Sequence, residues 1–183
     1  MPNDLNAAYQ AVIKAKADLL AALRDGEPTP VEDWSLRSTD GAPVRLGELF
    51  GDRRDLLVVH NMGSGCNYCT LWADGFRGLV EHIERRAAFV LCSNDPPEGV
   101  EAFALERGWN FRCVSGADSG FAKAMGYADE LGRPHPGVSA FHKRDDGTIV
   151  RTGHSPFGPG DDYCAAWPLF DLLKDGKGDF EPR

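Results

Sequence analysis

The chain of 183 residues predicts an α/β fold, a three-layer sandwich with a mixed central sheet and an N-terminal helical extension. Three observations predict it. Short apolar runs alternate with segments of helical periodicity, a glycine-rich turn joins one such run to a helix, and hairpin signals stand before and after this alternating region. The chain shows no linker and no internal repeat. We therefore expect a single domain at residues 31–183, preceded by the extension at residues 1–30.

The extension is predicted to form one amphipathic helix. Its apolar residues recur at helical spacing: Leu5, Ala8, Val12, Ala15, Leu19 and Leu23. Gly26, followed by Pro28 and Pro30, ends this pattern. We expect the helix to pack against the domain through its apolar side.

The domain begins with a hairpin and a central strand. Trp34–Leu36 and Val44–Leu46 bracket a turn and are predicted to pair as a hairpin. Asp55–Met62 contains a nearly continuous apolar run, which is typical of a parallel strand covered on both faces. Gly63-Ser64-Gly65 then allows the backbone to turn at no steric cost, and a helical pattern opens at Cys66.

The rest of the domain continues the alternation of strands and helices. In order, the sequence predicts a strand at 87–93, a helix from its N-cap Asp95 to about Arg107, a strand at 111–114, a short helix at 119–125, two strands at 137–141 and 148–150 joined by a turn at Asp146-Gly147, and a last helix from Asp161 to Leu173.

Charge and hydropathy exclude several classes of partner. The net charge of −8 argues against a nucleic acid as ligand. No window of about 18 apolar residues exists, so we expect no membrane partner. The first residues lack the basic and apolar regions of a secretory signal, which predicts a cytoplasmic location. The oligomeric state is left open.

Two of the five cysteines, Cys66 and Cys69, form a CxxC pair where a strand leads into a helix. An odd cysteine count without an export signal does not indicate a disulfide framework. A helix N-terminus presents unpaired N–H groups and a partial positive charge, which lower a CxxC thiol pKa to roughly 3.5–7.5. We therefore expect Cys66 to attack a disulfide as a thiolate. Cys69, one turn later and more buried, is expected to resolve the mixed disulfide.

Two structural alternatives compete with this catalytic interpretation. A zinc site would need a second CxxC or two histidines at ligand spacing, and Cys92, Cys113 and Cys164 offer no such pairing. Cysteines kept only for packing are the other alternative, because a free thiol behaves as a small hydrophobe. We expect no bound metal and no cofactor.

His60 lies near the end of the predicted central strand, six residues before Cys66. Successive side chains of a strand point to opposite faces of the sheet, and we expect the face that holds His60 to lie beneath the CxxC helix. An imidazole there would exchange a proton with Cys69, because it titrates near neutral pH. The alternative is a core histidine that is satisfied by hydrogen bonds. The sequence does not separate the two.

Three segments, Cys66–Phe76, Arg107–Phe111 and Pro136–Phe141, carry a resemblance to known proteins. The chain after residue 30 resembles the thioredoxin/peroxiredoxin superfamily. More closely, it resembles a bacterial thioredoxin-like family of unassigned function whose members are labelled predicted dithiol-disulfide oxidoreductases. The resemblance implies a thioredoxin-like sandwich in which Cys66 attacks and Cys69 resolves. It also places His60 near the buried acid that thioredoxins have beneath the active site.

The sequence departs from the superfamily at two places. Ser139 stands where thioredoxins have a cis-proline, so the preceding bond is expected to be trans and the substrate groove altered. We expect Tyr68, Trp72 and Ser139 to line this groove. In the peroxiredoxin loop Pro-x-x-x-Thr-x-x-Cys, the proline and threonine positions are here Val59 and Gly63, which disfavours a standard peroxidase.

The function predicted from the sequence is a cytoplasmic thiol–disulfide oxidoreductase. Its partner is expected to be a disulfide-bearing protein or a small thiol or peroxide substrate. The alternative is a redox-inactive or copper-holding thioredoxin-fold module, in which His135, His142 or His154 adds an imidazole to the two thiolates.

Overall fold

The computed structural model of the chain describes residues 2–183, with side chains described from Asp4 onward. Its strands form one eight-stranded sheet. The strand order is β1-β8-β7-β4-β5-β6-β2-β3. The strands are β1 (Thr29–Val31), β2 (Ser35–Ser38), β3 (Pro43–Arg45), β4 (Asp55–Asn61), β5 (Ala88–Ser93), β6 (Arg112–Ser115), β7 (Gly137–Lys143) and β8 (Ile149–Pro156). The helices are α1 (Pro2–Asp25), α2 (Asn67–Phe76), α3 (Val80–Ile83), α4 (Pro97–Arg107), α5 (Phe121–Ala124) and α6 (Ala166–Phe170), with a 3-10 turn η1 (Leu46–Glu48).

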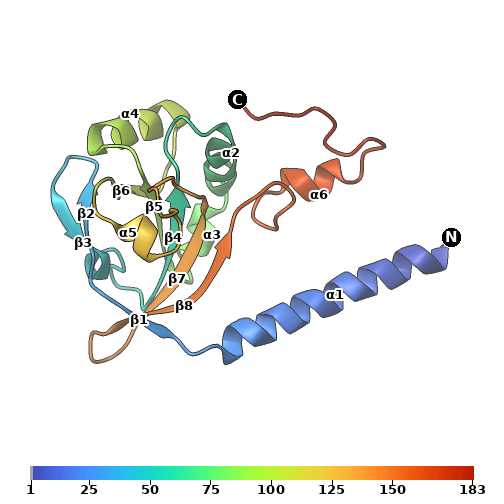
Figure 1. Cartoon of the computed structure of the whole chain (residues 1–183), viewed down its shortest axis with the longest axis horizontal. Coiled ribbons are helices and arrows are strands. Elements are labelled where there is room, and N and C mark those ends of the chain that lie inside the picture. Colours follow the sequence, from blue (N-terminus) through green and yellow to red (C-terminus); the bar gives the residue numbers. More distant parts are fainter. Residues whose placement is uncertain (1) are drawn as a thin grey trace.

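The centre of the sheet is parallel and its flanks are antiparallel, which confirms the predicted mixed sheet. β4 pairs in parallel with β5, and β5 with β6, while β7 lies antiparallel on the other side of β4. The chain steps from β4 to β5 to β6 in one direction across the sheet. Because parallel crossovers are right-handed, the two connecting helices α2 and α4 lie on the same face (Figure 1).

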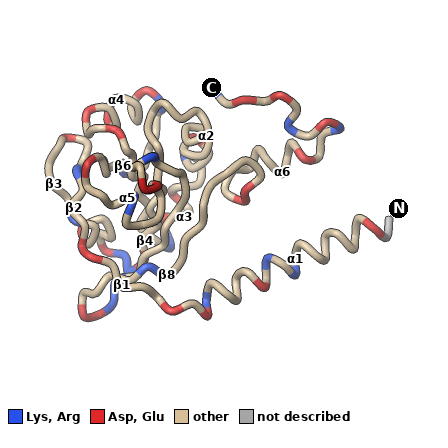
Figure 2. Tube along the Cα trace, in the orientation of Figure 1, with Lys and Arg blue, Asp and Glu red and all other residues tan. Residues whose placement is uncertain are grey.

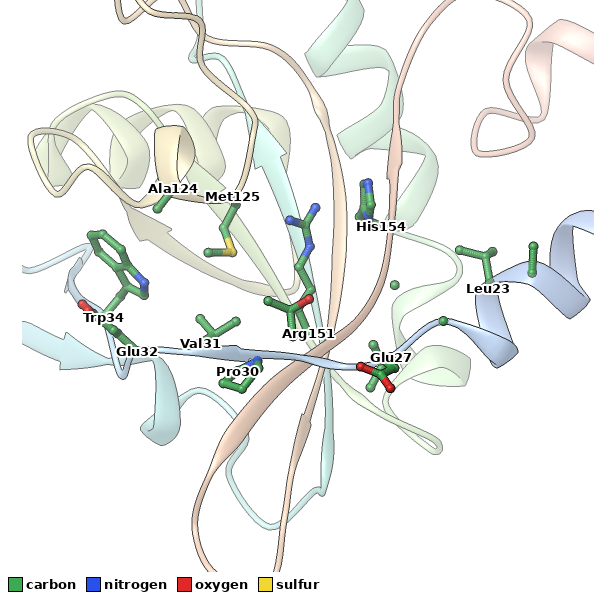
Figure 3. Close-up of a pocket in the computed structure, with 15 residues that line it drawn as sticks. Leu23, Glu27, Pro30, Val31, Glu32, Trp34, Ala124, Met125, Arg151 and His154 are labelled. Atoms are coloured by element: carbon green, nitrogen blue, oxygen red, sulfur yellow. The ribbon is translucent and has the colours of Figure 1, made fainter.

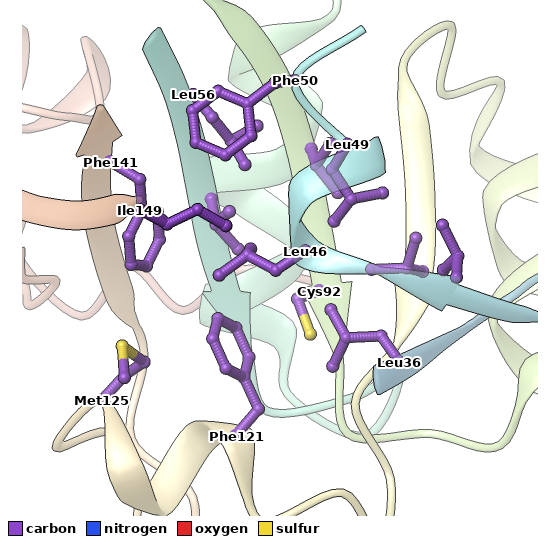
Figure 4. Close-up of a cluster of buried hydrophobic side chains, with 14 of the residues drawn as sticks. Leu36, Leu46, Leu49, Phe50, Leu56, Cys92, Phe121, Met125, Phe141 and Ile149 are labelled. Atoms are coloured by element: carbon purple, nitrogen blue, oxygen red, sulfur yellow. The ribbon is translucent and has the colours of Figure 1, made fainter. Parts of the chain in front are cut away.

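Alternate residues of β4 enter two separate cores. Leu56 and Val58 pack with Phe121 and Phe141 in the core under η1 and α5 (Figure 4). Val59 packs with Trp72 in the second core, under α2 and α4. This period of two therefore settles which β4 side chains face the CxxC helix.

The two edge strands both contain a proline. Pro30 lies in β1, which pairs only with β8, and Pro43 lies in β3, which pairs only with β2. A proline has no N–H to give to a ladder, so it is tolerated at an edge, where it also discourages pairing with another chain. In the sequence Pro30 follows the end of the helical pattern, and β1 is not predicted there.

The N-terminal helix forms as predicted, but the expectation that it packs on the domain is wrong. α1 projects away from the sheet (Figure 1), and its large apolar side chains are exposed, from 38% for Leu23 to 62% for Leu5. Lys16 of α1 forms an ion pair with Asp162 from the C-terminal part of the chain, with Nζ and Oδ1 2.7 Å apart. Among residues 2–183, no helix is both long and apolar enough to cross a bilayer.

Two predicted helix boundaries differ from the structure. α4 begins at Pro97 with Pro96 as its N-cap, so Asp95 is not the cap. The last helix is shorter than predicted and starts at Ala166. The side chain of Asp161 instead accepts hydrogen bonds from the backbone N–H groups of Tyr163 and Cys164, which forms a local turn before the helix.

The tight contact at Gly137 gives a stability prediction. A Cβ atom there would overlap the ring of Tyr127 and lie 2.6 Å from the carbonyl oxygen of Ser155. Gly137→Ala is expected to destabilise the fold by about 1–3 kcal/mol, because the buried ring has to move. Gly153→Ala in the adjoining strand is the matched control, since nothing lies within 4 Å of its added methyl group. Urea unfolding measures both, and equal midpoints would contradict the prediction.

Candidate thiol site

The CxxC pair lies where β4 leads into α2, as the sequence predicted. Cys66 is the N-cap residue of α2, with extended backbone angles of φ −103° and ψ 99°. Its Sγ accepts a hydrogen bond from the backbone N–H of Cys69 at 3.1 Å. Its carbonyl oxygen accepts from the backbone N–H and the hydroxyl of Thr70, at 3.0 and 3.1 Å. The sulfur therefore occupies the position in which a Ser or Asp side chain usually caps a helix.

The loop before Cys66 is held by side chains from the same edge of the sheet. The Asn61 side-chain oxygen accepts from the N–H of Gly63 at 2.7 Å, and the Asp95 carboxylate accepts from the N–H of Ser64 at 2.6 Å. Gly63 has φ +118°, and a Cβ there would lie 2.6 Å from the Asp95 carboxylate. Only glycine suits this position, both for its backbone angle and for the close carboxylate.

Asp95 belongs to the site, although the sequence predicts it as a helix N-cap. The signal for this position is that Asp95 follows the apolar strand after the CxxC helix, as Gly63 follows the strand before it. The carboxyl ends of parallel strands meet at one edge of a sheet, so residues that follow them come together. In the structure the N–H of Asp95 donates to the Ser93 hydroxyl, and its carbonyl oxygen accepts from the Ser115 hydroxyl. β5 and β6 together therefore position the loop of the thiol site.

The environment of Cys66 favours its thiolate. A hydrogen bond from the Cys69 thiol is the largest cause, and the backbone N–H groups of Cys69 and Tyr68 add to it, so that the pKa of Cys66 falls to about 6. Partial burial opposes this shift. Cys66 remains partly accessible to solvent, as a nucleophile must be.

The other four thiols are buried and favour the protonated form. The pKa of Cys69 is raised, first by its hydrogen bond to Cys66 and then by burial. Burial alone raises the pKa of Cys92 and of Cys113 to about 12. Burial is also the main cause of the raised pKa of Cys164. A buried thiol held as S–H is a poor nucleophile, so Cys66 is the one cysteine whose environment suits attack.

Tyr68, between the two cysteines, contacts the C-terminal segment. Its ring stacks on Trp167 with centroids 6.1 Å apart, and a hydrogen bond to Glu181 raises the pKa of its phenol. Trp167 in turn contacts Phe170 and Phe180 edge-on. The sequence predicts Tyr68 beside a substrate groove, but it does not predict the contact with residues 167–181.

Trp72 and Ser139, the other two residues expected to line the groove, lie in the interior. Trp72 is 2% exposed and packs against Phe157 with centroids 5.4 Å apart. Ser139 is 0% exposed. All peptide bonds among the described residues are trans, including the one before Ser139, as expected. Neither side chain offers surface to a substrate in this structure.

His60 lies on the face of β4 opposite the CxxC helix. It is buried, its Nε2 lies 3.0 Å from the Ser139 hydroxyl, and its ring stacks on Tyr127 with centroids 4.0 Å apart. Phe121 covers it further, with centroids 5.3 Å apart. α2 packs over the face that holds Val59 instead. The expectation that His60 looks under α2 is therefore not met, because the alternation directs its side chain into the other core.

The histidines considered as metal ligands are dispersed. His142 Nδ1 lies 2.7 Å from the Asp55 carboxylate, and His154 lines a groove beside α1 (Figure 3). The described part of the chain contains no group of three or more His, Cys, Asp or Glu side chains placed to hold a metal ion. No observation thus favours the copper-holding alternative.

Solved structures similar to this one include peroxiredoxins. Peroxidoxin BcpB from Mycobacterium tuberculosis is 26% identical, with a TM-score of 0.57, over 70% of this chain and 84% of that one. Reduced Prx3 from Vibrio vulnificus, solved with hydrogen peroxide, is 14% identical, with a TM-score of 0.58, over 74% and 90%. A Bacteroides thetaiotaomicron protein, provisionally assigned as a protein disulfide isomerase, is 20% identical, with a TM-score of 0.50, over 70% and 77%. These similarities confirm the thioredoxin-like fold.

A comparison with protein families matches residues 8–181 to a family described as "Bacterial protein of unknown function (DUF899)". The match covers α1 from residue 8 onward, together with all the strands of the sheet. None of the curated proteins compared with the chain matches it.

The hydrogen bond from Cys69 gives a prediction on reactivity. Cys69→Ala is expected to slow iodoacetamide alkylation of Cys66 at about pH 6 by roughly tenfold or more, because an ordinary thiol with a pKa of about 8.5 is almost fully protonated there. Cys69→Ser keeps an O–H donor and is expected to change the rate much less. Mass spectrometry of the labelled peptide gives the rates. Equal slowing in both variants would show that the Cys69 donor does not tune Cys66.

The burial of His60 gives a prediction on pH. Burial, with a contribution from Arg151, lowers its pKa to about 3, whereas in the unfolded chain it is about 6.5. Between these values the unfolded chain binds a proton that the folded chain does not. Stability therefore falls as pH drops through this window, by up to about 1.4 kcal/mol per pH unit.

His60→Gln is expected to remove this contribution, as measured by urea unfolding between about pH 5 and 7. His82→Gln, at an exposed histidine, is the control and should keep the wild-type dependence on pH. The prediction fails if the two variants show the same slope.

Proposed function

The chain belongs to the bacterial family DUF899, whose members are of unknown function, and we propose that it is a thiol–disulfide oxidoreductase that uses Cys66 and Cys69. The observation that carries this proposal is the Cys66 sulfur at the N-terminus of α2. It accepts the N–H of Cys69, its pKa is lowered to about 6, and it is partly accessible. Thiolate character and access together are what thiol–disulfide exchange requires.

The exchange has two steps. The Cys66 thiolate attacks one sulfur of a substrate disulfide, which forms a mixed disulfide and releases one substrate thiolate. Cys69 then gives its proton to solvent and attacks Cys66 Sγ, which forms the Cys66–Cys69 disulfide and releases the second thiolate. The substrate disulfide is reduced by two electrons and the CxxC pair is oxidised by two; an external dithiol then reduces the Cys66–Cys69 disulfide and returns the pair to its dithiol form.

The change in charge at Cys66 links the two steps. Free Cys66 is a thiolate that accepts the Cys69 hydrogen bond, and this bond keeps Cys69 protonated. Once Cys66 is bound to substrate its negative charge is gone. The largest cause of the raised Cys69 pKa then disappears, and the second thiol is released for attack. The resolving thiol thus becomes reactive only after substrate has bound.

The proposal extends to substrate and compartment. A disulfide-bearing protein or a small disulfide is the favoured substrate, because the loop lacks the proline and threonine of the peroxiredoxin motif at Val59 and Gly63. A reducing compartment such as the cytoplasm suits a chain with three further buried free thiols and no disulfide framework. His60 lies on the face of β4 opposite α2 and has no step in this scheme.

A trapping experiment tests the proposal. Cys69→Ser is expected to stop the reaction at the mixed disulfide, because no thiol is left to resolve it. Reduction of a fluorescent model disulfide, with dithiothreitol to recycle the enzyme, should fall by at least about 100-fold in Cys66→Ser. Cys113→Ser is the matched control, since this buried thiol lies away from the helix terminus, and it should keep most of the activity.

Two further measurements distinguish the oxidoreductase from other uses of the cysteines. Mass mapping of the oxidised protein should find the bridge between Cys66 and Cys69. A bridge elsewhere, or full activity in Cys66→Ser, would overturn the proposal. Faster consumption of hydrogen peroxide than of disulfides would instead indicate a peroxidase that uses the same cysteine.

A further inference from the structure

The exposed side of α1 is an apolar feature that the thiol chemistry does not use. Large apolar side chains along this 24-residue helix are exposed: Leu5, Tyr9, Val12, Ile13, Leu19, Leu20 and Leu23. Leu5, Val12 and Leu19, with Tyr9 and Leu23 beside them, form a continuous stripe, whereas Ile13 and Leu20 lie outside it. Isolated exposed apolar residues are normal on a protein surface, but a continuous stripe indicates an interaction site. Residues 2–183 place no other element over this stripe (Figure 1).

The spacing of the stripe is that of a coiled coil. Leu5, Val12 and Leu19 recur every seven residues, and three alanines, Ala8, Ala15 and Ala22, follow each of them by three residues. These are the a and d positions of three heptads. A helix with this repeat buries its stripe against a second helix rather than against a flat sheet.

The order of large and small residues fits an antiparallel partner of the same sequence. When two copies of α1 run in opposite directions about a centre between residues 13 and 14, Leu5 of one copy meets Ala22 of the other. Val12 likewise meets Ala15, and Leu19 meets Ala8. Every layer then combines one large side chain with one alanine. A two-fold axis requires such self-complementarity, because each contact occurs twice.

A groove at the base of α1 continues this stripe. It has a volume of about 440 Å³ and is lined by Ala22 and Leu23 on the helix side, with Trp34 and Met125 across it (Figure 3). In the antiparallel arrangement the first turn of the second copy's helix arrives beside Ala22 and Leu23. The groove therefore lies where the end of that helix needs space.

Charge also fits at this end. Arg151 lines the groove, and its buried Nε has no hydrogen-bond partner among the described residues. Glu27 and Glu32 line the groove too, but both are exposed and neither forms a salt bridge with Arg151. Asp4 of the second copy would arrive opposite Leu23 and supply a carboxylate to this guanidinium.

The charges of α1 argue against a lipid surface as the partner. The helix carries three basic residues, Lys14, Lys16 and Arg24, and three acidic ones, Asp4, Asp18 and Asp25. Figure 2 shows basic and acidic segments interspersed along the helix. A helix that lies on an anionic membrane usually has a polar face rich in Lys and Arg.

We propose that α1 pairs in antiparallel with α1 of a second copy of this chain, with the end of each helix seated in the groove at the base of the other. The helix is about 36 Å long, so the two domains sit at opposite ends of the pair. This arrangement explains why an amphipathic helix projects from the domain instead of covering it. It does not depend on the thiol chemistry.

Two variants of the full chain test the proposal in analytical ultracentrifugation. The wild type is expected to sediment as a dimer at micromolar concentrations. Ala15→Asp places a carboxylate in the central layer of both helices and should weaken the dimer by at least about 100-fold, because neither charge finds a partner there. Ala17→Asp is the matched control: the same substitution two residues away, on the polar side, should leave the dimer intact.

Cross-linking tests the orientation. In a chain with Leu5→Cys and Ala22→Cys, mild oxidation should join position 5 of one copy to position 22 of the other. Links between identical positions would show a parallel pair and overturn the proposal. A monomeric wild type, or equal effects of Ala15→Asp and Ala17→Asp, would also overturn it. So would flotation of the wild type with phosphatidylserine–phosphatidylcholine vesicles that Ala15→Asp abolishes, since that would make lipid the partner.

Discussion

The hydrogen bond from the Cys69 backbone N–H to Cys66 Sγ, at 3.1 Å, is the constraint around which the thiol site is built. It forms only because Cys66 caps α2 with extended backbone angles, which aim its side chain back at the first helical turn. A helix N-terminus leaves such N–H groups without intrahelical partners and carries a partial positive charge. The Cys69 N–H satisfies the helix terminus and also adds to the lowering of the Cys66 pKa, whose largest cause is the hydrogen bond from the Cys69 thiol. Helix capping therefore contributes to the activation of the nucleophile.

The ends of the central strands fix the position of Cys66 at the start of α2. α2 begins at the edge where β4, β5 and β6 all end, and polar groups that follow the three strands meet there. Asp95 is central among them, since its carboxylate fixes the loop before Cys66 while its backbone is held by hydroxyls from β5 and β6. The same parallel arrangement that supplies the apolar core therefore supplies the rigid support of the site. The two cannot be altered independently.

His60 is a buried polar group that packs in the core on the opposite face of β4 from α2. Its ring lies between the Ser139 hydroxyl and the face of Tyr127, and the Tyr127 hydroxyl donates to the carbonyl oxygens of Val138 and Ser155. These contacts join β4, β7 and β8 beneath the surface. Burial keeps the imidazole neutral, so it stabilises the core as a hydrogen-bonding group rather than as a charge. The resemblance to thioredoxins correctly located a buried titratable residue, but not the core it faces.

The sequence by itself determined the local elements and the position of the thiol pair. Periodicity, turn residues and the spacing of Cys66 and Cys69 are short-range properties, so the main strands, the hairpins and the strand-to-helix turn were predictable. Only the tertiary structure decided which face of β4 the CxxC helix covers, because that depends on β5 lying beside β4 and on the right-handed crossover. It also decided that Trp72 is interior and that α1 projects from the domain. Which surface each apolar side chain is packed against depends on residues far apart in the chain, so the pattern within one element does not determine it.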